Sequence, residues 1–225
     1  MRDAVWFVRP GPNEELRYSL RSAHAHVGVE NVWIVGDPPP WYTGPRIKGN
    51  RFGTKQRNVY DNVRILAEHP DLPAEVAVWN DDMYALEPVA VEMAWRCLLD
   101  EHLGNLRGRG WWWQSLMLTR TYLRRHGHRD PLSYELHRPF PIVRADMARI
   151  LRDAAKVRPD NPPQWRTLYG VITDAGGDQA DHDGKVYGAG RPVPSGPWLS
   201  TSDGNVGRIM DRLEETFPEA SPWER

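Results

Sequence analysis

The stretch Glu75-Val76-Ala77-Val78-Trp79-Asn80-Asp81-Asp82 decides the interpretation of the fold, because an apolar run ends abruptly in polar side chains. The apolar residues predict a buried β-strand over 75–79, with Asn80-Asp81-Asp82 directly after it. In open α/β sheets, ligands bind beyond the carboxyl ends of the strands, where the strand order reverses. We therefore expect the two aspartates to lie at the ligand-binding edge of a sheet.

The N-terminal part of the sequence predicts neighbours for this strand. Apolar runs at 5–8 and 31–35 are expected strands, and a helix capped by Asn13 is expected between them. A strand, a helix and a strand in this order form a βαβ unit, whose apolar strands are typical of a parallel sheet covered on both faces. Arg9 follows the first strand and is therefore expected at the same sheet edge as Asp81.

The rest of the chain predicts mainly helices and then loops. Helical periodicity predicts a helix over 55–68, before the strand at 75–79. After a short segment at 83–86, it predicts further helices over 87–100, 111–125, 144–156 and 205–217. From Pro159 onward prolines and glycines become frequent, which favours loops and short strands that wrap over the sheet. Since no internal repeat or linker is recognisable, we expect one domain over 1–225, with the βαβ part in 1–90 and helices and C-terminal loops in 91–225.

Composition excludes several classes of protein. Hydrophobic residues make up 40% of the 225 residues, enough for a sizeable core, and the net charge of -1 argues against a nucleic-acid-binding surface. Cys97 is the single cysteine, so neither an intrachain disulfide nor a four-cysteine zinc site can form, and a reducing compartment is favoured. No run of about 18 apolar residues predicts a membrane span, and the N-terminus has no signal-peptide pattern. We therefore expect a soluble, cytoplasmic protein.

Adjacent aspartates at a strand end have two possible meanings. Their carboxylates can bind Mg²⁺ or Mn²⁺, hard cations that prefer such oxygens and often take substrate phosphates as further ligands. Alternatively, the residues form a turn, where Asn and Asp are favoured for local hydrogen bonding. The apolar strand before Asp81 and Asp82 favours the metal, because carboxylates beside a buried strand are costly unless a cation compensates them.

His137 and Lys55 are the other candidates for chemistry. His137 precedes Arg138-Pro139-Phe140-Pro141, whose prolines hold the backbone extended. This suits a general base or a phosphate donor, although a structural histidine is the simpler alternative. Lysine is rare and occurs only at 48, 55, 156 and 185, so each one deserves inspection. Lys55 opens the helix expected at 55–68, where it either neutralises a diphosphate with the helix N-terminus or is a solvated helix start.

Two further clusters are weaker candidates. Trp111-Trp112-Trp113 suggests sugar stacking, but three consecutive residues cannot share one helix face, so burial in a core or an interface is favoured. The polar group of Asp178, Asp181, His182 and Asp183 could add a metal ligand, although a stretch flanked by glycines is more typical of an exposed loop.

Four motifs follow one another along the chain: Asn13-Glu14-Glu15-Leu16-Arg17-Tyr18-Ser19-Leu20-Arg21-Ser22, Asn31-Val32-Trp33-Ile34-Val35-Gly36-Asp37, Asn80-Asp81-Asp82-Met83-Tyr84, and His137-Arg138-Pro139-Phe140-Pro141 with Asp146-Met147. In this order they resemble the motifs of Stealth-type capsular polysaccharide phosphotransferases. Compact glycosyltransferase-like proteins of actinobacteria and their phages have the same order, and the chain resembles these more closely overall. The likeness runs from about Val5 to Tyr169, with a fainter one at Leu199-Ser200-Thr201-Ser202.

The resemblance implies a glycosyltransferase-A-like, Rossmann-like α/β fold with a mixed sheet flanked by helices. Residues 1–90 would bind the nucleotide, and 91–225 would form the acceptor side. The implied activity is that of a metal-dependent glycosyltransferase, which uses Mn²⁺ or Mg²⁺ and moves a sugar from a nucleotide diphosphate sugar to an acceptor hydroxyl on a protein or glycan. The implied location is the cytoplasm, that of the host if a phage encodes the chain.

The resemblance also implies roles for single residues. Asp82 would bind the metal, with Asp81 as a further ligand or ribose contact, and Arg9 would lie near the nucleotide. Arg166, in Gln164-Trp165-Arg166-Thr167-Leu168-Tyr169, matches a recurring basic position and would touch phosphate. His137 would orient or deprotonate the acceptor, while Lys55 would help Arg9 to steady the diphosphate.

One departure bears on the choice between sugar and sugar-phosphate transfer. The first strand reads Trp6-Phe7-Val8-Arg9-Pro10-Gly11, where Stealth enzymes have an acidic-tyrosine-threonine-tryptophan pattern, and the chain is shorter than most of them. We therefore favour glycosyl transfer. One alternative is a Stealth-like sugar-phosphate transferase that releases a nucleoside monophosphate, with His137 as its pivotal residue. The other is a non-catalytic module that binds a glycan or an assembly.

Overall fold

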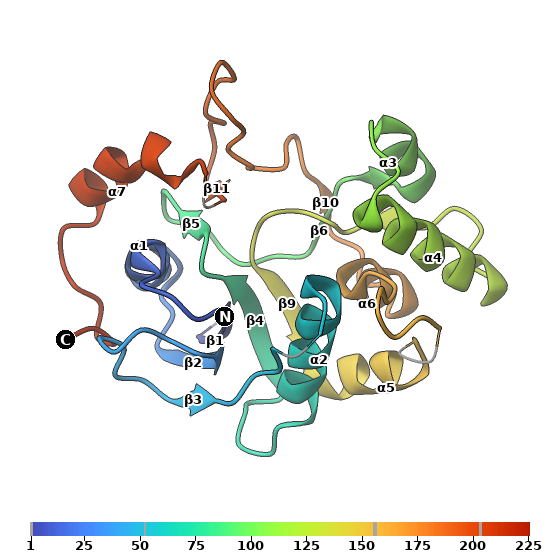
Figure 1. Cartoon of the computed structure of the whole chain (residues 1–225), viewed down its shortest axis with the longest axis horizontal. Helices are drawn as coiled ribbons and strands as arrows, with labels where there is room; N and C mark the ends of the chain where they lie inside the picture. The colour runs from blue at the N-terminus through green and yellow to red at the C-terminus, as the bar shows by residue number, and fades with distance from the viewer. Residues whose placement is uncertain (1, 52, 155–156, 203) are drawn as a thin grey trace.

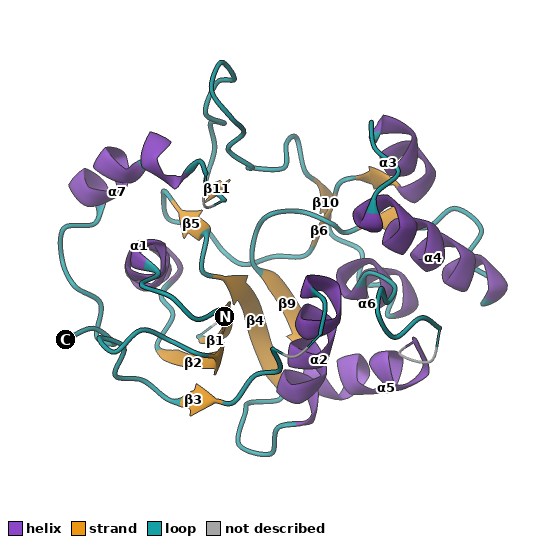
Figure 2. Ribbon diagram, viewed as in Figure 1, coloured by secondary structure: helices purple, strands orange, loops and turns teal. Residues whose placement is uncertain are grey.

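The computed structural model describes residues 2–51, 53–154, 157–202 and 204–225. Its centre is a five-stranded sheet with the strand order β3-β2-β1-β4-β9 (Figures 1 and 2). The strands are β1 (Asp3–Val8), β2 (Asn31–Gly36), β3 (Arg46–Ile47), β4 (Glu75–Asn80) and β9 (Phe140–Val143). The first four run parallel, and β9 pairs antiparallel with β4. The predicted α/β architecture, a mixed sheet flanked by helices, is confirmed.

Both faces of the sheet are buried, because successive side chains of each strand point to opposite faces. On β1, Val5 joins the core cluster formed with α2 (Lys55–Glu68), α5 (Arg144–Ala154) and α6 (Trp165–Ile172). Trp6 joins the opposite cluster, formed with α1 (Glu14–Ser22) and the C-terminal segment. In that second layer, Trp6 stacks on Trp79 of β4 with the ring centroids 5.0 Å apart. The strands β1, β2 and β4 therefore present apolar side chains on both faces of the sheet, as the sequence indicates.

The strand order reverses between β1 and β4. From β1 the chain adds β2 and then β3 on one side, and it returns to place β4 on the other. Phe7 lies opposite Asn80 in this parallel pair, so Arg9 and Asp81 emerge at the same edge of the sheet, as predicted. Gly36 ends β2 at this edge with φ 134°, and a Cβ there would lie 1.9 Å from the carbonyl oxygen of Val8. Only glycine lets the two strand ends approach so closely.

Three short strand pairs and further helices surround this sheet. The pairs are β5 (Met83–Ala85) with β11 (Trp198–Ser200), β6 (Ala94–Trp95) with β10 (Asp178–Gln179), and β7 (Cys97–Leu98) with β8 (Leu132–Ser133). The other helical elements are η1 (Ala23–Val27), α3 (Leu99–Asn105), α4 (Trp111–Arg125), η2 (Val206–Arg208) and α7 (Met210–Thr216). None of the described helices is long and apolar enough to cross a membrane.

Several predicted elements need correction. The helix predicted over 87–100 is wrong up to residue 98, because β6 and β7 pair there with distant strands and this pairing overrides local helical preference. Asn13 occupies the N-cap position of α1, but its side chain donates to the carbonyl of Arg9 at 2.6 Å instead of capping the helix. The helix predicted over 205–217 is divided into η2 and α7.

The remaining helix predictions agree closely with the structure. The bounds of α2 and α4 match the predicted 55–68 and 111–125. For the helix predicted over 144–156, α5 covers the part up to Ala154, and residues 155–156 lie outside the described residues. The segment after Pro159, where loops and short strands were expected, also contains the helix α6. This helix is short and apolar and lies between two loops, so the sequence pattern did not identify it.

Candidate functional site

A cavity of about 680 Å³ opens beyond the carboxyl ends of β1, β2 and β4, and we call it the strand-end cavity. Arg9, Lys55, Asp81 and Asp82, all selected from the sequence, line it together. Lys55 is the first residue of α2 and is exposed, and Arg9 has half of its side chain exposed and lies 3.6 Å from a carboxylate oxygen of Glu15. The wall of the strand-end cavity therefore combines carboxylates with cations, as a site for a diphosphate and a metal requires.

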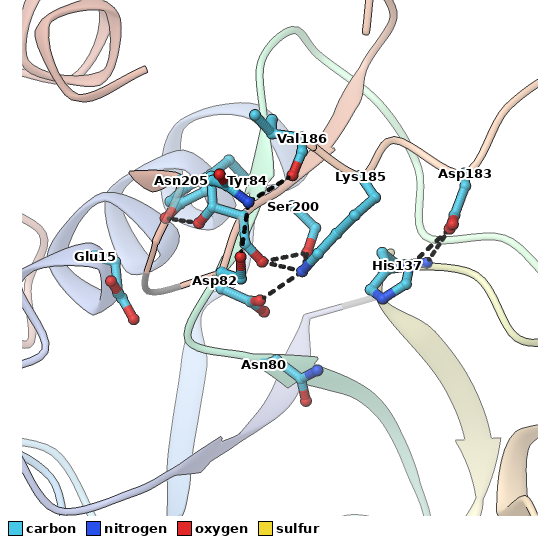
Figure 3. A network of polar contacts seen from close by, with 12 residues as sticks. Glu15, Asn80, Asp82, Tyr84, His137, Asp183, Lys185, Val186, Ser200 and Asn205 are labelled. Carbon is cyan, nitrogen blue, oxygen red and sulfur yellow. Dashed lines mark hydrogen bonds and ion pairs between the residues drawn. The ribbon is translucent and has the colours of Figure 1, made fainter. Parts of the chain in front are cut away.

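Asp82 is fixed by contacts from the C-terminal segment. The N–H of Thr201 donates to its backbone carbonyl at 3.0 Å, next to the pairing of β5 with β11. Nζ of Lys185 lies 3.2 Å from its Oδ2 (Figure 3). The other oxygen, Oδ1, is buried, as is Oδ2 of Asp81, and neither has a hydrogen-bond partner within the described parts of the chain. Such oxygens carry negative charge that the surrounding protein leaves incompletely compensated.

The pKa of Asp81 reflects the same shortage of compensation. Burial, and after it the nearby charges of Asp82 and Glu15, raise this pKa from the ordinary 3.8 to about 7, although Arg9 acts in the opposite direction. A carboxyl group with such a pKa needs a cation, or a proton, at neutral pH. Asp81 and Asp82 do form a turn between β4 and β5, as the alternative interpretation expected, but Asp81 is buried in it and not solvated.

The two carboxylates could hold Mg²⁺ or Mn²⁺ together with ligands from outside the protein. Among the described residues, there is no group of three or more His, Cys, Asp or Glu side chains placed to hold a metal. Mg²⁺ is commonly bound by one or two carboxylates, with substrate phosphates and water as the other ligands. The partnerless oxygens of Asp81 and Asp82 fit this incomplete set, so metal binding at this edge remains a prediction that the donor atoms support.

A second cavity, of about 550 Å³, adjoins the first, and we call it the helix-side cavity. The two share Phe7, Lys55, Val59 and Asn80 in their linings, so they lie next to each other at the end of β4. His137 and Arg166 line the helix-side cavity. The structure thus places the six predicted residues around two adjacent cavities, with Lys55 common to both.

His137 is held by Asp183. Oδ1 of Asp183 accepts the backbone N–H of His137 at 3.0 Å and lies 2.8 Å from its Nδ1, and Oδ2 accepts a hydrogen bond from Arg96 at 2.8 Å. Burial opposes the ionisation of Asp183, but the His137 contacts and the charge of Arg96 outweigh it and hold its pKa well below the ordinary value. The ionised carboxylate therefore accepts Nδ1–H, and Figure 3 shows the other ring nitrogen turned away from Asp183.

Arg166 is buried, with 7% of its surface exposed. Its guanidinium donates to the carbonyl of Leu136 and stacks near the ring of Trp165, 5.1 Å from the ring centroid. Burial lowers the pKa of Arg166, and the charge of the neighbouring Glu135 acts against this shift. Arg166 thus lies in the helix-side cavity and not in the strand-end cavity, and its contact with phosphate stays a prediction.

The segment Asp183-Gly184-Lys185 contributes to both cavities. Gly184 has φ 71°, and a Cβ there would lie 2.7 Å from the carbonyl oxygen of Trp198. This backbone directs Asp183 to His137 and Lys185 to Asp82, two residues apart along the chain. Asp183 was expected in an exposed loop, yet only 11% of its side chain is exposed. The rarity of lysine had marked Lys185 for inspection, but no sequence pattern connected it with Asp82.

The tryptophan cluster is only partly buried. Trp111 and Trp112 are 50% and 40% exposed, so neither is buried in the core of this chain, whereas Trp113 packs against the core. Burial of the first two in an interface stays a prediction. Of the three, Trp112 alone is part of the lining of the helix-side cavity. Trp111 and Trp112 are exposed because they lie at the start of α4, whereas the buried residues of this helix begin at Ser115.

Comparisons with known proteins neither support nor oppose the family resemblance. No family model matches the chain, and no curated protein is significantly similar to it.

Proposed function

We propose that the chain is a metal-dependent glycosyltransferase that moves a sugar from a nucleotide diphosphate sugar to an acceptor hydroxyl. The observation that carries the proposal is the junction of the two cavities at Lys55 and Asn80. One cavity offers carboxylates and cations to a diphosphate, and the other offers an oriented histidine to a hydroxyl. The resemblance of the motifs to glycosyltransferase-like proteins, and with it a glycosyltransferase-A type of fold, supports the same assignment.

The donor would lie in the strand-end cavity, at the position where open α/β sheets bind nucleotides. Asp82 and Asp81 would hold Mn²⁺ or Mg²⁺, and Arg9 and Lys55 would neutralise the diphosphate from the other side. When bound, the metal supplies Lewis-acid stabilisation of the negative charge on the leaving diphosphate. The amino end of α2, where Thr54 caps the helix by accepting the N–H of Arg57 at 3.2 Å, adds a favourable dipole for phosphate.

The acceptor would lie in the helix-side cavity, with its hydroxyl beside Nε2 of His137. Because Asp183 accepts Nδ1–H, Nε2 is left as the proton acceptor. In the reaction, the acceptor oxygen forms a bond to the anomeric carbon while the bond from that carbon to the diphosphate breaks. The bonding electrons leave with the diphosphate, and the hydroxyl proton passes to Nε2. His137 thus serves as the general base.

The decisive experiment is turnover of a panel of nucleotide diphosphate sugars with and without Mn²⁺, followed by identification of the nucleotide product. We expect Mn²⁺-dependent release of a nucleoside diphosphate, which the variant Asp82→Asn loses by roughly 100-fold or more. Asp100→Asn is the matched control, since Asp100 is an exposed aspartate bound to Arg120 and Arg124.

Other products would lead to other conclusions. A nucleoside monophosphate would replace our proposal with sugar-phosphate transfer. Equal, metal-independent turnover by the wild type and Asp82→Asn would contradict the metal role. If no nucleotide sugar with Mn²⁺ were turned over or raised the melting temperature, the non-catalytic binding module would be favoured, because ligands that bind the folded state stabilise it by mass action.

A further inference from the structure

Lys185 contacts the carboxylate of Asp82, one of the two side chains that would hold a metal ion. Its ammonium lies 3.2 Å from Oδ2 of Asp82 and 3.3 Å from Oγ of Ser200, and it also donates to the carbonyl of Thr201 (Figure 3). Only 15% of the Lys185 side chain is exposed. An ammonium with three protein acceptors is a well-defined part of the site rather than a solvated surface charge.

The charges around Lys185 are unevenly compensated. Lys185 neutralises one oxygen of Asp82, whereas Oδ1 of Asp82 and Oδ2 of Asp81 have no hydrogen-bond partner in the described ranges. Glu15 also lines the cavity. Arg9 lies 3.6 Å from Glu15, so Lys185 is the cation that contacts Asp82 itself. A divalent cation would compensate the two partnerless carboxylate oxygens more completely.

We infer that Lys185 is the internal counter-ion of Asp82, that it competes with the divalent cation for this carboxylate, and that it binds the diphosphate once the cation is bound. The inference rests on the proposed metal-dependent function and deepens it. A divalent cation on Asp82 would repel the ammonium, while the incoming diphosphate would attract it. The lysine stem has four rotatable bonds, and its point charge suits such a move within one cavity.

The first test is the affinity for Mn²⁺ alone, measured by electron paramagnetic resonance without nucleotide. Lys185→Gln removes the charge but keeps an amide that can donate to the Thr201 carbonyl, and Lys185→Met is the second variant. We expect both to bind Mn²⁺ about tenfold more tightly than the wild type, because a competing partly buried cation is gone. Lys48→Met, at an exposed lysine outside the lining of both cavities, should bind like the wild type.

The second test uses inorganic pyrophosphate as the probe, titrated by calorimetry at saturating Mn²⁺. Lys185→Gln should bind it about tenfold more weakly than the wild type, because one phosphate-binding cation is missing. The melting temperature offers a further measure. Without metal, Lys185→Gln should melt below the wild type since Asp82 loses its partner, and Mn²⁺ should raise its melting temperature more than that of the wild type.

The outcomes separate this inference from the proposed function. If Mn²⁺ binds the wild type and both Lys185 variants equally, or binds the variants more weakly, the competition is refuted while the metal-dependent function stands. If pyrophosphate binds Lys185→Gln as tightly as the wild type, the move of Lys185 to the diphosphate is refuted. If Mn²⁺ binds neither the wild type nor the variants, both the metal-dependent function and the inference fail together.

Discussion

Oδ1 of Asp183 receives two hydrogen bonds from His137, one from the backbone N–H at 3.0 Å and one from Nδ1 at 2.8 Å. Two contacts to the same oxygen fix both the backbone and the ring of the histidine. Arg96 holds the other carboxylate oxygen at 2.8 Å, so the carboxylate cannot rotate freely. The arrangement orients a histidine that is itself 41% exposed at its side chain and faces a cavity.

We predict that Asp183→Asn disturbs the orientation and the tautomer of His137 while the fold persists. The substituted amide can present either its oxygen or its NH₂ group to Nδ1, so the Nδ1–H form is no longer imposed. With His137 as the proposed base, turnover should fall by about 100-fold or more, as in enzymes whose base histidine loses its carboxylate. The ¹⁵N shifts of the His137 ring should change from one tautomer to a mixture. Asp181→Asn, at an exposed aspartate nearby, is the control, and an unchanged tautomer in Asp183→Asn would refute the positioning role.

Gly36→Ala is predicted to destabilise the strand-end edge. The added Cβ would lie 1.9 Å from the carbonyl oxygen of Val8, on backbone that cannot move without disrupting the pairing of β1 with β2. We expect a loss of about 3 kcal/mol or more in the free energy of unfolding, measured by urea denaturation. Gly188→Ala is the control, because nothing lies within 4 Å of its added Cβ. Equal stability of the two variants would show that the strand ends separate easily.

The sheet, and the edge at which the carboxyl ends of its strands meet, could be predicted because the necessary signals are local. Each of the strands β1, β2 and β4 is an apolar run that ends in a turn, and parallel pairing then places Arg9 beside Asp81 without further information. The helix α2 could be predicted for the same reason, since its apolar residues recur with helical periodicity within one short segment. These features depend on neighbouring residues and on general rules of sheet geometry.

The partners of the predicted residues could not be found in this way. Asp183 meets His137 across 46 positions of sequence, and Lys185 meets Asp82 across 103. Both contacts depend on the positive φ of Gly184 and on the pairing of β5 with β11, which no periodicity encodes. The error over 87–98 has the same origin, because β6 and β7 exist only through strands that come much later in the chain.

The C-terminal end is predicted to be held by Glu224. Its carboxylate, 2% exposed, binds Arg17 at 2.9 Å and Arg21 at 2.8 Å, and accepts a hydrogen bond from the Ser221 N–H at 2.9 Å. Glu224→Gln should lower the free energy of unfolding by about 2–3 kcal/mol at pH 7, since two partly buried arginines lose their counter-charge. Glu219→Gln, at an exposed glutamate, should leave it unchanged, and equal stability of the two variants would contradict the prediction.

The pH dependence of the stability that Glu224 contributes follows from the pKa of this residue. Burial opposes its ionisation, but the hydrogen bonds from Arg21, Ser221 and Arg17 outweigh this and lower the pKa from 4.5 to about 2. Because the pKa in the folded state is the lower one, the stabilisation is complete above pH 4.5 and is lost as the pH falls towards about 2. The stability difference between the wild type and Glu224→Gln should therefore shrink over this range, and a constant difference in urea denaturation would contradict the assignment.

Asp81 should have the opposite pH dependence in metal-free protein. Its folded-state pKa of about 7 lies above the ordinary 3.8, so the folded state retains a proton that the unfolded chain releases. Stability is therefore highest below pH 3.8 as far as this group is concerned, and it is lost as the pH rises through about 7. In Asp81→Asn this loss should be absent, which makes the variant about 2–4 kcal/mol more stable than the wild type at pH 8 with a chelator present. Asp37→Asn, at an exposed aspartate lining the same cavity, should keep the wild-type pH profile.

Adding Mn²⁺ at pH 8 should stabilise the wild type more than Asp81→Asn, because the ionised carboxylate of Asp81 gains a cation. Parallel pH profiles of the wild type and Asp81→Asn in metal-free protein would contradict the raised pKa of Asp81.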